Sequence, residues 1–293
     1  MPPSANYPPV PSDSFSDAAL VILGHGSTKQ ADSGAPVLQH AAELRRRRIF
    51  GEVFEAFWKQ GPQVKQVLSA LTAPRVFIVP LFISEGYFSV EVIPCELGFA
   101  PGQSTLRSQH STRIYTKPVG THPSMANVVL ARARDVVAQF PFPRAAKPQD
   151  TTLFIAGHGT ERNENSRKAI EQQVELIRST NLYAGVHGVF LEEEPRIPGC
   201  YNMAKTRNIV VVPFFISDGM HAREDIPILL GEPERAVKQR LAARQPTWRN
   251  PTEKNGKLVW YSSAVGTEAH VADVILERVR EAENTGSVCD HKT

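Results

Sequence analysis

The chain has few cysteines and no long apolar run. Its three cysteines are an odd number without a CxxC spacing, so neither a disulfide framework nor a cysteine zinc site is indicated. No apolar run reaches the roughly 18 residues that a membrane helix needs. The opening segment MPPSANYPPVPSDSFSD has neither the basic nor the apolar region of a secretory signal. We therefore expect a cytoplasmic location and no membrane partner.

The chain also has little net charge. A formal charge of +3 over 293 residues does not indicate a nucleic-acid partner, although it would not repel an acidic ligand. The one conspicuous basic cluster, RRRR at 45–48, falls at the end of a predicted helix, where it offsets the helix dipole. With 41% hydrophobic and 22% charged residues, the composition is typical of a globular protein of two ordinary domains.

What the sequence does contain is an internal duplication. LGHGST at 23–28 returns as AGHGTE at 156–161, and ISEGYFSVEVIP at 83–94 returns as ISDGMHAREDIP at 216–227, both 133 residues later. A third pair, YTKPVGTHPSMANVVLARAR at 115–134 and YSSAVGTEAHVADVILERVR at 261–280, is 146 residues apart. The second half therefore carries about thirteen extra residues between positions 227 and 261.

Each half alternates apolar strand segments with helical patterns. The strand segments are ALVILG, EVFEAFW, PRVFIVPLF and TRIYTKPV in the first half, and TLFIAG, GVHGVFL, NIVVVPFF and KLVWYSSAV in the second. Helical patterns lie near 33–48, 62–73, 89–99, 122–139, 164–179, 195–205, 222–243 and 268–283. Continuous β-branched runs such as IVVVPFF are typical of strands that are buried on both faces of a parallel sheet.

The alternation predicts an α/β fold of two tandem duplicated domains. Each domain is expected to form a four-stranded parallel sheet flanked by helices, and the two domains are expected to face a shared cleft. The predicted division is a disordered arm at 1–17, a first domain at 18–140, a linker at 141–151, a second domain at 152–284 and a tail at 285–293.

Candidate chemical groups follow three strands of the second half. His158 follows the first strand, Glu192 closes the second and His221 follows the third. Ligands of open parallel sheets bind at the carboxyl ends of the strands. Two imidazoles and a carboxylate form a nitrogen and oxygen ligand set suited to Co, Ni, Fe or Zn, and a neutral imidazole can also act as a base near pH 7. Glu193 is an alternative to Glu192, and the residues do not say which histidine is the base.

The first half lacks most of this set. His25 remains in GHGS, but Phe88 stands where the second copy has His221, and Trp58 is assigned to the position of Glu192. Neither aromatic ring can bind a metal ion, whereas both can form a stacking wall for a flat ligand. We therefore expect the metal site in the second half, with His25 structural or at most in contact with the ligand.

The order and spacing of these segments resemble the class II tetrapyrrole chelatases, specifically the two-domain form of the CbiX-type sirohydrochlorin chelatases. The motifs that carry the resemblance are GHGS at 24–27, GHGT at 157–160, FLEEEP at 190–195, VVVPFF followed by ISDGMHAREDIP, and the VGT segment that opens the last helix. Together they extend over residues 19–283. The resemblance implies an enzyme that inserts a divalent metal into a planar polycarboxylate tetrapyrrole and needs no nucleotide.

Carried over to this sequence, the resemblance implies that His158, His221 and Glu192 bind the metal and catalyse its insertion. The groups expected to contact the tetrapyrrole are Gly157, Gly159, Thr160, Gly219, Arg223, His25 and Phe88, with Arg162 as a further cation. The metal is a substrate, with Co²⁺ first and Fe²⁺ or Ni²⁺ as alternatives, because a nitrogen and oxygen site does not select among them. The sequence differs from the more frequent pattern of the family in keeping the working set in the second half.

Two other functions stay open from the residues alone. A tetrapyrrole or metal carrier would use the same cleft without turnover. A metal-dependent hydrolase is less favoured, because the sequence contains no nucleophile elbow and no paired acidic metal bridge. The chain is expected to act as a monomer or weak oligomer.

Overall fold

The computed structural model describes residues 15–27, 31–160 and 164–289. Arg162, residues 1–14 of the predicted arm and residues 290–293 of the predicted tail lie outside these ranges. The predicted arm and tail are too long, since a strand already begins at Phe15, which stacks on Phe50 at 5.2 Å between ring centroids, and the last helix continues to Cys289. In the described ranges, no helix combines the length and the apolar character needed to cross a membrane.

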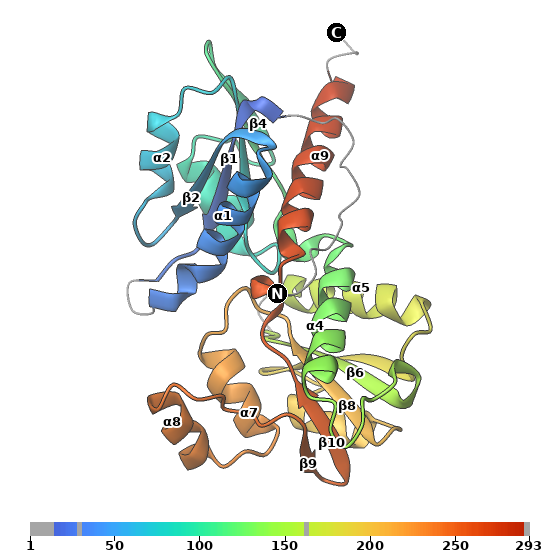
Figure 1. The fold of residues 1–293 in the computed structure, drawn as a ribbon. Coiled ribbons are helices and arrows are strands. Elements are labelled where there is room, and N and C mark those ends of the chain that lie inside the picture. The colour runs from blue at the N-terminus through green and yellow to red at the C-terminus, as the bar shows by residue number, and fades with distance from the viewer. Residues whose placement is uncertain (1–14, 28–30, 161–163, 290–293) are drawn as a thin grey trace.

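Each half forms one five-stranded sheet, and the two sheets have the same topology (Figure 1). The first, in the order β2-β1-β3-β5-β4, contains β1 (Phe15–Gly24), β2 (Phe50–Phe57), β3 (Arg75–Pro80), β4 (Thr105–Arg107) and β5 (Thr112–Tyr115). The second, in the order β7-β6-β8-β10-β9, contains β6 (Thr151–Gly157), β7 (Gly185–Phe190), β8 (Asn208–Pro213), β9 (Thr252–Lys254) and β10 (Lys257–Tyr261). The predicted α/β fold with two duplicated units is confirmed.

Each sheet has one strand more than the four that were predicted. The extra strands, β4 and β9, are three residues long and pair antiparallel with β5 and β10, whereas the remaining pairs are parallel. Their sequences, TLR and TEK, contain no apolar run, so the hydrophobic pattern did not reveal them. Asn255 and Gly256 join β9 to β10 with φ angles of 49° and 73°, as in an Asn-Gly hairpin turn.

Helices cover both faces of each sheet. They are α1 (Ala35–Arg47), α2 (Val64–Ala70), α3 (Ile93–Glu96) and α4 (Met125–Gln139) in the first half, and α5 (Asn165–Ser179), α6 (Cys200–Met203), α7 (Ile226–Leu229), α8 (Glu234–Ala242) and α9 (Val271–Cys289) in the second. The single helix predicted at 222–243 is interrupted between α7 and α8, because Gly231 has a φ of +98° and Pro233 precedes α8. Helix α8 has no counterpart in the first half and accounts for most of the extra residues.

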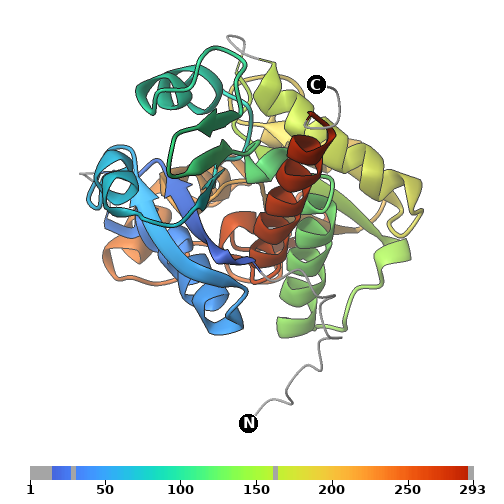
Figure 2. The same ribbon diagram turned by 90° about the horizontal axis from the view of Figure 1, so that it is seen from above.

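The last helix of each half packs on the sheet of the other half. Helix α4 contacts β8, β10 and α5, whereas α9 contacts β3 and α1. Figure 1 shows α9, in red, beside the upper sheet of the first half and α4, in green, beside the lower sheet of the second, and Figure 2 shows the two helices side by side. The predicted division at 18–140 and 152–284 follows the sequence repeat. Each sheet, however, is covered in part by the last helix of the other half.

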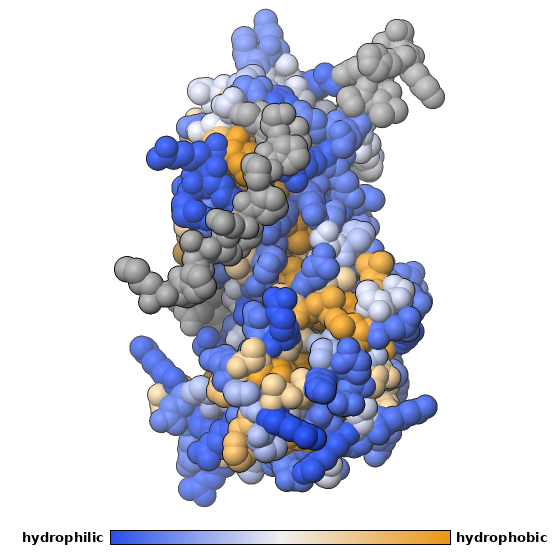
Figure 3. Space-filling model, turned by 45° about the vertical axis from the view of Figure 1, so that its right-hand side comes forward, coloured by the Kyte–Doolittle hydropathy of each residue, from blue (hydrophilic) through white to orange (hydrophobic). Residues whose placement is uncertain are grey.

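Repeat-equivalent arginines hold the exchanged helices. Arg132 in α4 donates to the carbonyl of Ala264 at 3.1 Å, and Arg278 in α9 donates to the carbonyl of Pro118 at 3.1 and 2.9 Å. Helix α9 also forms an ion pair with Arg47 of the first half. The largest core cluster consequently contains buried side chains from both halves. On the face shown in Figure 3, apolar side chains gather at mid-height, between more hydrophilic ends.

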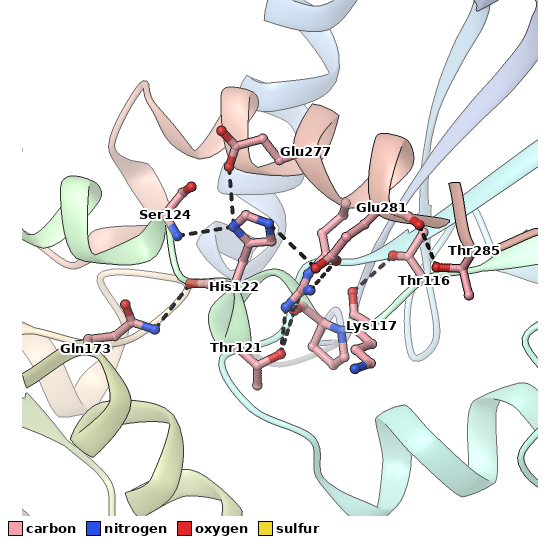
Figure 4. A network of polar contacts seen from close by, with 11 residues as sticks. Thr116, Lys117, Thr121, His122, Ser124, Gln173, Glu277, Glu281 and Thr285 are labelled. Atoms are coloured by element: carbon pink, nitrogen blue, oxygen red, sulfur yellow. Dashed lines mark hydrogen bonds and ion pairs between the residues drawn. The ribbon is translucent and has the colours of Figure 1, made fainter. Parts of the chain in front are cut away.

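A polar network lies where α9 crosses the first half (Figure 4). The Ser124 N–H donates to Nδ1 of His122 at 3.1 Å, and the Gln173 amide donates to the His122 carbonyl at 3.2 Å. The Glu277 carboxylate lies 3.3 Å from the same Nδ1. Burial, together with the nearby Arg278 charge, lowers the pKa of His122, so the neutral imidazole is favoured there. The network joins α5, α9 and the segment before α4.

Candidate functional site

His158 follows β6 directly and has a fixed ring orientation. Its Nδ1–H donates to the carbonyl of Gly159 at 2.7 Å, which leaves the Nε2 lone pair free. Gly159 has a φ of +65°, and a Cβ there would lie 2.6 Å from the Glu193 side chain. A Cβ on Gly157 would lie 2.0 Å from Ile170 Cδ1. Gly159 is therefore required by its left-handed backbone and by the close Glu193 and Phe190 side chains, whereas a side chain at Gly157 would have to displace the end of Ile170.

His221 opens the π-helical turn His221–Asp225, which follows the loop after β8. Its Nδ1–H donates to Oδ2 of Asp225 at 2.6 Å, so its Nε2 is also free. The rings of His158 and His221 lie edge to face, with 4.9 Å between centroids and 82° between planes. The structure thus brings together the two histidines that the strand ends suggested. Asp225 was not predicted, although its spacing of four residues from His221 on a helical turn is a usable signal.

The two glutamates proposed as alternative third ligands have different surroundings. Glu192 is 57% exposed, and its Oε2 lies 3.7 Å from Nδ1 of His158. Glu193 is only 15% exposed, and Arg167 Nε donates to its Oε2 at 3.0 Å. An ion pair with Arg167 therefore holds the partly buried Glu193 side chain, whereas the Glu192 side chain is exposed.

The described residues hold two potential nitrogen ligands and no preformed third. Across residues 15–27, 31–160 and 164–289, no group of three or more His, Cys, Asp or Glu side chains is arranged to hold a metal ion. Glu192 approaches His158 on the Nδ1 side, which already bonds to Gly159. A ligand role for Glu192 requires its exposed side chain to turn toward Nε2.

The other predicted contact residues lie around this pair. Gly219 and His221 line a small pocket of about 220 Å³, together with Phe215, Ile216, Ser217 and Met220. Arg223 is exposed and lines a second, larger cavity of about 730 Å³, which Arg132 of the exchanged helix α4 also lines. Thr160 ends the described part of the loop after β6, and Arg162 lies beyond it.

The corresponding region of the first half is aromatic. His25 repeats the geometry of His158, since its Nδ1–H donates to the Gly26 carbonyl at 2.8 Å. Its ring contacts Trp58 at 5.4 Å and Phe88 at 6.3 Å between centroids. Phe88 thus takes the place of His221 beside the strand-end histidine, as the offset of 133 residues indicates.

The assignment of Trp58 to the position of Glu192 is wrong by one residue. At the offset of 133, Trp58 corresponds to Leu191, and Lys59 corresponds to Glu192. The backbone agrees, because the Lys59 N–H donates to the carbonyl of His25 at 2.9 Å as the Glu192 N–H donates to that of His158 at 3.0 Å. A positive side chain therefore stands in the first half where the second has a carboxylate.

Solved structures share this fold. A multi-domain protein of Deinococcus radiodurans, described as structurally similar to chelatases, matches with a TM-score of 0.70 and 28% identity over 89% of this chain and 54% of its own. This chain thus spans about half the length of that protein. SirB from Bacillus subtilis, solved with Fe³⁺, matches with a TM-score of 0.63 and 20% identity over 92% of this chain and 97% of its own. The fold is that of the chelatase class.

Within that class, the chain belongs to the CbiX family, whose model matches residues 19–136 and 152–282. A Halobacterium salinarum protein named probable sirohydrochlorin cobaltochelatase is 41% identical over 90% of this chain and 91% of its own. The sirohydrochlorin cobaltochelatase of Methanopyrus kandleri is 28% identical over 44% of this chain and 95% of its own, so it corresponds to a single half. The family resemblance and the two-domain form predicted from the motifs are confirmed, and the chain is a metal chelatase.

Proposed function

We propose that this chelatase inserts a divalent metal ion into sirohydrochlorin or a closely related polycarboxylate tetrapyrrole. Co²⁺ is the first candidate, because relatives that match both the whole chain and a single half are named sirohydrochlorin cobaltochelatases. Fe²⁺ and Ni²⁺ are the alternatives, since imidazole and carboxylate ligands suit all three ions. The same fold has been solved with Fe³⁺ and with cobalt in SirB.

The observation that carries the proposal is that both imidazoles use their Nδ1–H in a hydrogen bond. The Nδ1–H of His158 donates to the Gly159 carbonyl, and the Nδ1–H of His221 donates to the Asp225 carboxylate. Metal-binding histidines commonly donate their second ring N–H in this way, which fixes the tautomer. Two Nε2 lone pairs are therefore available to one ion on an accessible surface, with Glu192 as the proposed third ligand.

Metal insertion also requires the removal of two pyrrole protons from the macrocycle. We assign the first proton to Nε2 of His221, which can accept it once the ion has moved from this nitrogen to the pyrrole nitrogens. The Asp225 carboxylate then stabilises the imidazolium that forms. The exposed Glu192 carboxylate can pass the second proton to solvent. No nucleotide, nucleic acid or membrane takes part in this scheme.

The tetrapyrrole itself is proposed to lie against the loops that end the strands. The backbone of Gly157, Gly159, Thr160 and Gly219 would allow a flat ligand to approach closely. Arg223 is exposed and is proposed to bind a substrate carboxylate. Phe88 and His25 of the first half are proposed to contact the macrocycle. Because α4 and α9 already cover the opposite sheets, we propose a monomer or weak oligomer.

The direct test mixes the purified full chain with sirohydrochlorin and Co²⁺, Fe²⁺ or Ni²⁺ in separate reactions. Metal insertion is followed from the change in macrocycle absorbance. The proposal expects insertion well above the rate without protein, fastest with Co²⁺. Tight binding of the macrocycle with no catalysed insertion of any of the three ions would overturn it and favour a carrier.

A further inference from the structure

Lys59 stands at the repeat position of Glu192 and reverses its charge. The two backbones make the same hydrogen bond to the strand-end histidine, so the two side chains begin from equivalent places. A cation beside His25 and the aromatic rings cannot help to bind a metal ion, and would repel one. The first half therefore presents a group suited to a different part of the substrate.

The Lys59 ammonium lies over two aromatic rings. Its Nζ is 4.7 Å from the centroid of the Trp58 ring and 5.8 Å from that of Phe88. The two rings contact each other at 4.8 Å between centroids. In the part of the chain that the structure describes, no ion pair occupies Lys59. Cation–π attraction thus holds an unpaired ammonium in a defined place.

The rings beside Lys59 remain partly open to solvent. Phe88 is 44% exposed, and the neighbouring Tyr87 and Val90 are 60% and 41% exposed. Tyr87 contacts Phe88 at 5.7 Å between centroids. Exposed apolar groups gathered in this way mark a binding surface. Flat rings beside a cation fit a ligand that is flat in its body and anionic at its edge.

This surface lies near the start of α5. The amide of Asn165, the first residue of α5, donates to the carbonyl of Glu85 at 2.6 Å. Glu85 lies two residues before Tyr87 and three before Phe88, which opens the helical turn Phe88–Val92, and Asn165 lies seven residues after His158 in the sequence. The segment before Phe88 is therefore in contact with the helix that follows His158 along the chain.

We propose that Lys59 binds a peripheral carboxylate of the tetrapyrrole while Trp58 and Phe88 contact its face. The inference rests on the proposed function and assigns the first half a specific task in it. A charge-assisted hydrogen bond at the macrocycle edge orients the ring, and the aromatic surface accepts it without competing for metal. Selection of a polycarboxylate macrocycle then depends on Lys59, and binding of the metal does not.

The test compares Lys59→Met with the parent enzyme in the full chain. We expect the KM for sirohydrochlorin to rise about tenfold or more, the typical loss when a charged hydrogen bond is removed. The kcat should change less than about twofold, and the KM for Co²⁺ should stay unchanged, because the ion binds in the second half. Lys59→Arg, which keeps the charge, should recover most of the affinity. Raised salt should weaken sirohydrochlorin binding in the parent more than in Lys59→Met.

Lys65→Met is the matched control, since Lys65 is an exposed lysine of the same half that pairs with Glu96 at 3.4 Å. It should leave the KM for sirohydrochlorin unchanged. The inference is overturned if Lys59→Met binds metal-free sirohydrochlorin as tightly as the parent in a titration, or if Lys65→Met weakens it equally. If the parent itself neither binds nor metallates sirohydrochlorin, the proposed function fails first and this assignment fails with it.

Discussion

The two halves of the chain have the same backbone turn after their first strand, but different side chains surround that turn. In both, a GHG turn places a histidine whose Nδ1–H donates to the next carbonyl, at 2.8 Å for His25 and 2.7 Å for His158. Pairs that differ include Phe88 and His221, Lys59 and Glu192, and Val92 and Asp225. A histidine present in both halves is thus part of the turn itself, and its neighbours distinguish the proposed metal site from the aromatic surface.

The largest difference between the halves should appear when their strand-end histidines are compared directly. We expect His158→Ala to slow Co²⁺ insertion into sirohydrochlorin by about 100-fold or more, since a ligand or base is lost, and His221→Ala to do the same. His25→Ala should cost only about threefold, within the range of a lost apolar contact with the substrate. Initial rates from macrocycle absorbance measure this.

His110→Ala supplies the control, because His110 is exposed and far along the chain from either GHG turn. It should match the parent. Equal losses in His25→Ala and His158→Ala would contradict a division of labour between the halves.

The second-largest effect on metal insertion should come from the Asp225 carboxylate, which accepts a hydrogen bond from His221. Asp225→Asn keeps the size of the side chain but removes the charge that its Oδ2 places 2.6 Å from Nδ1 of His221. Loss of such a partner typically lowers metal affinity or activity by about 10- to 100-fold. The dependence of the initial rate on Co²⁺ concentration measures it. Val92→Asn, which places the same residue at the equivalent position of the first half, should leave that dependence unaltered, and an equal effect there would contradict the assignment.

The exchanged helices allow a comparison of stability. Arg278 is 2% exposed and bonds to Pro118 and Thr121 across the halves, so Arg278→Met should lower the free energy of unfolding by about 3 kcal/mol. Arg132→Met removes the equivalent bonds from a less buried site and should cost about 2 kcal/mol. Urea denaturation measures both values.

Arg134→Met is the control for these variants, because Arg134 is 71% exposed and its ion pair is with the adjacent, exposed Asp135. It should change the free energy of unfolding by less than about 0.5 kcal/mol. If Arg278→Met were equally mild, the exchanged contact would add nothing to stability.

The smallest effect concerns pH. His40 is 1% exposed, and burial lowers its pKa from the ordinary 6.5. Below pH 6.5 the unfolded chain binds a proton that the folded chain does not, so stability falls as the pH falls. His40→Gln introduces the residue that the second half has at Gln173. The variant should lose less stability between pH 6.5 and 5 than the parent, by up to about 1.4 kcal/mol per pH unit.

Urea denaturation at several pH values measures this difference. His110→Gln, at an exposed position, should keep the pH dependence of the parent. Parallel curves for the parent and His40→Gln would show that His40 binds its proton at the same pH in the folded and the unfolded chain, against expectation.

Repetition made the fold and the histidine pair predictable from the sequence. A fixed offset of 133 residues located the strand ends, and parallel strands bring their carboxyl ends to one edge, so His158 and His221 could be paired without coordinates. The different surroundings of Glu192 and Glu193 could not be predicted this way. They depend on Arg167, which lies on α5, is distant in sequence from both glutamates and pairs with Glu193.

The packing of α4 and α9 on the sheet of the other half could not be predicted from the sequence, for a related reason. Helices α4 and α9 have the same apolar pattern, and a helix presents the same stripe whether it packs on its own sheet or on the other one. Edge strands β4 and β9 were missed because they are short and polar. Lys59 was missed because the alignment of the two halves placed Trp58, one residue too early, opposite Glu192. The backbone hydrogen bonds at the strand ends correct this alignment.

The crossing of α9 onto β3 also constrains the order in which the chain can be completed during synthesis. A ribosome makes β3, which ends at Pro80, long before it makes α9, which begins at Val271. The apolar face that α9 covers on the first sheet must therefore stay uncovered until synthesis has passed residue 271. A premature stop codon before residue 271 would thus damage the first sheet, which lies far from it in sequence.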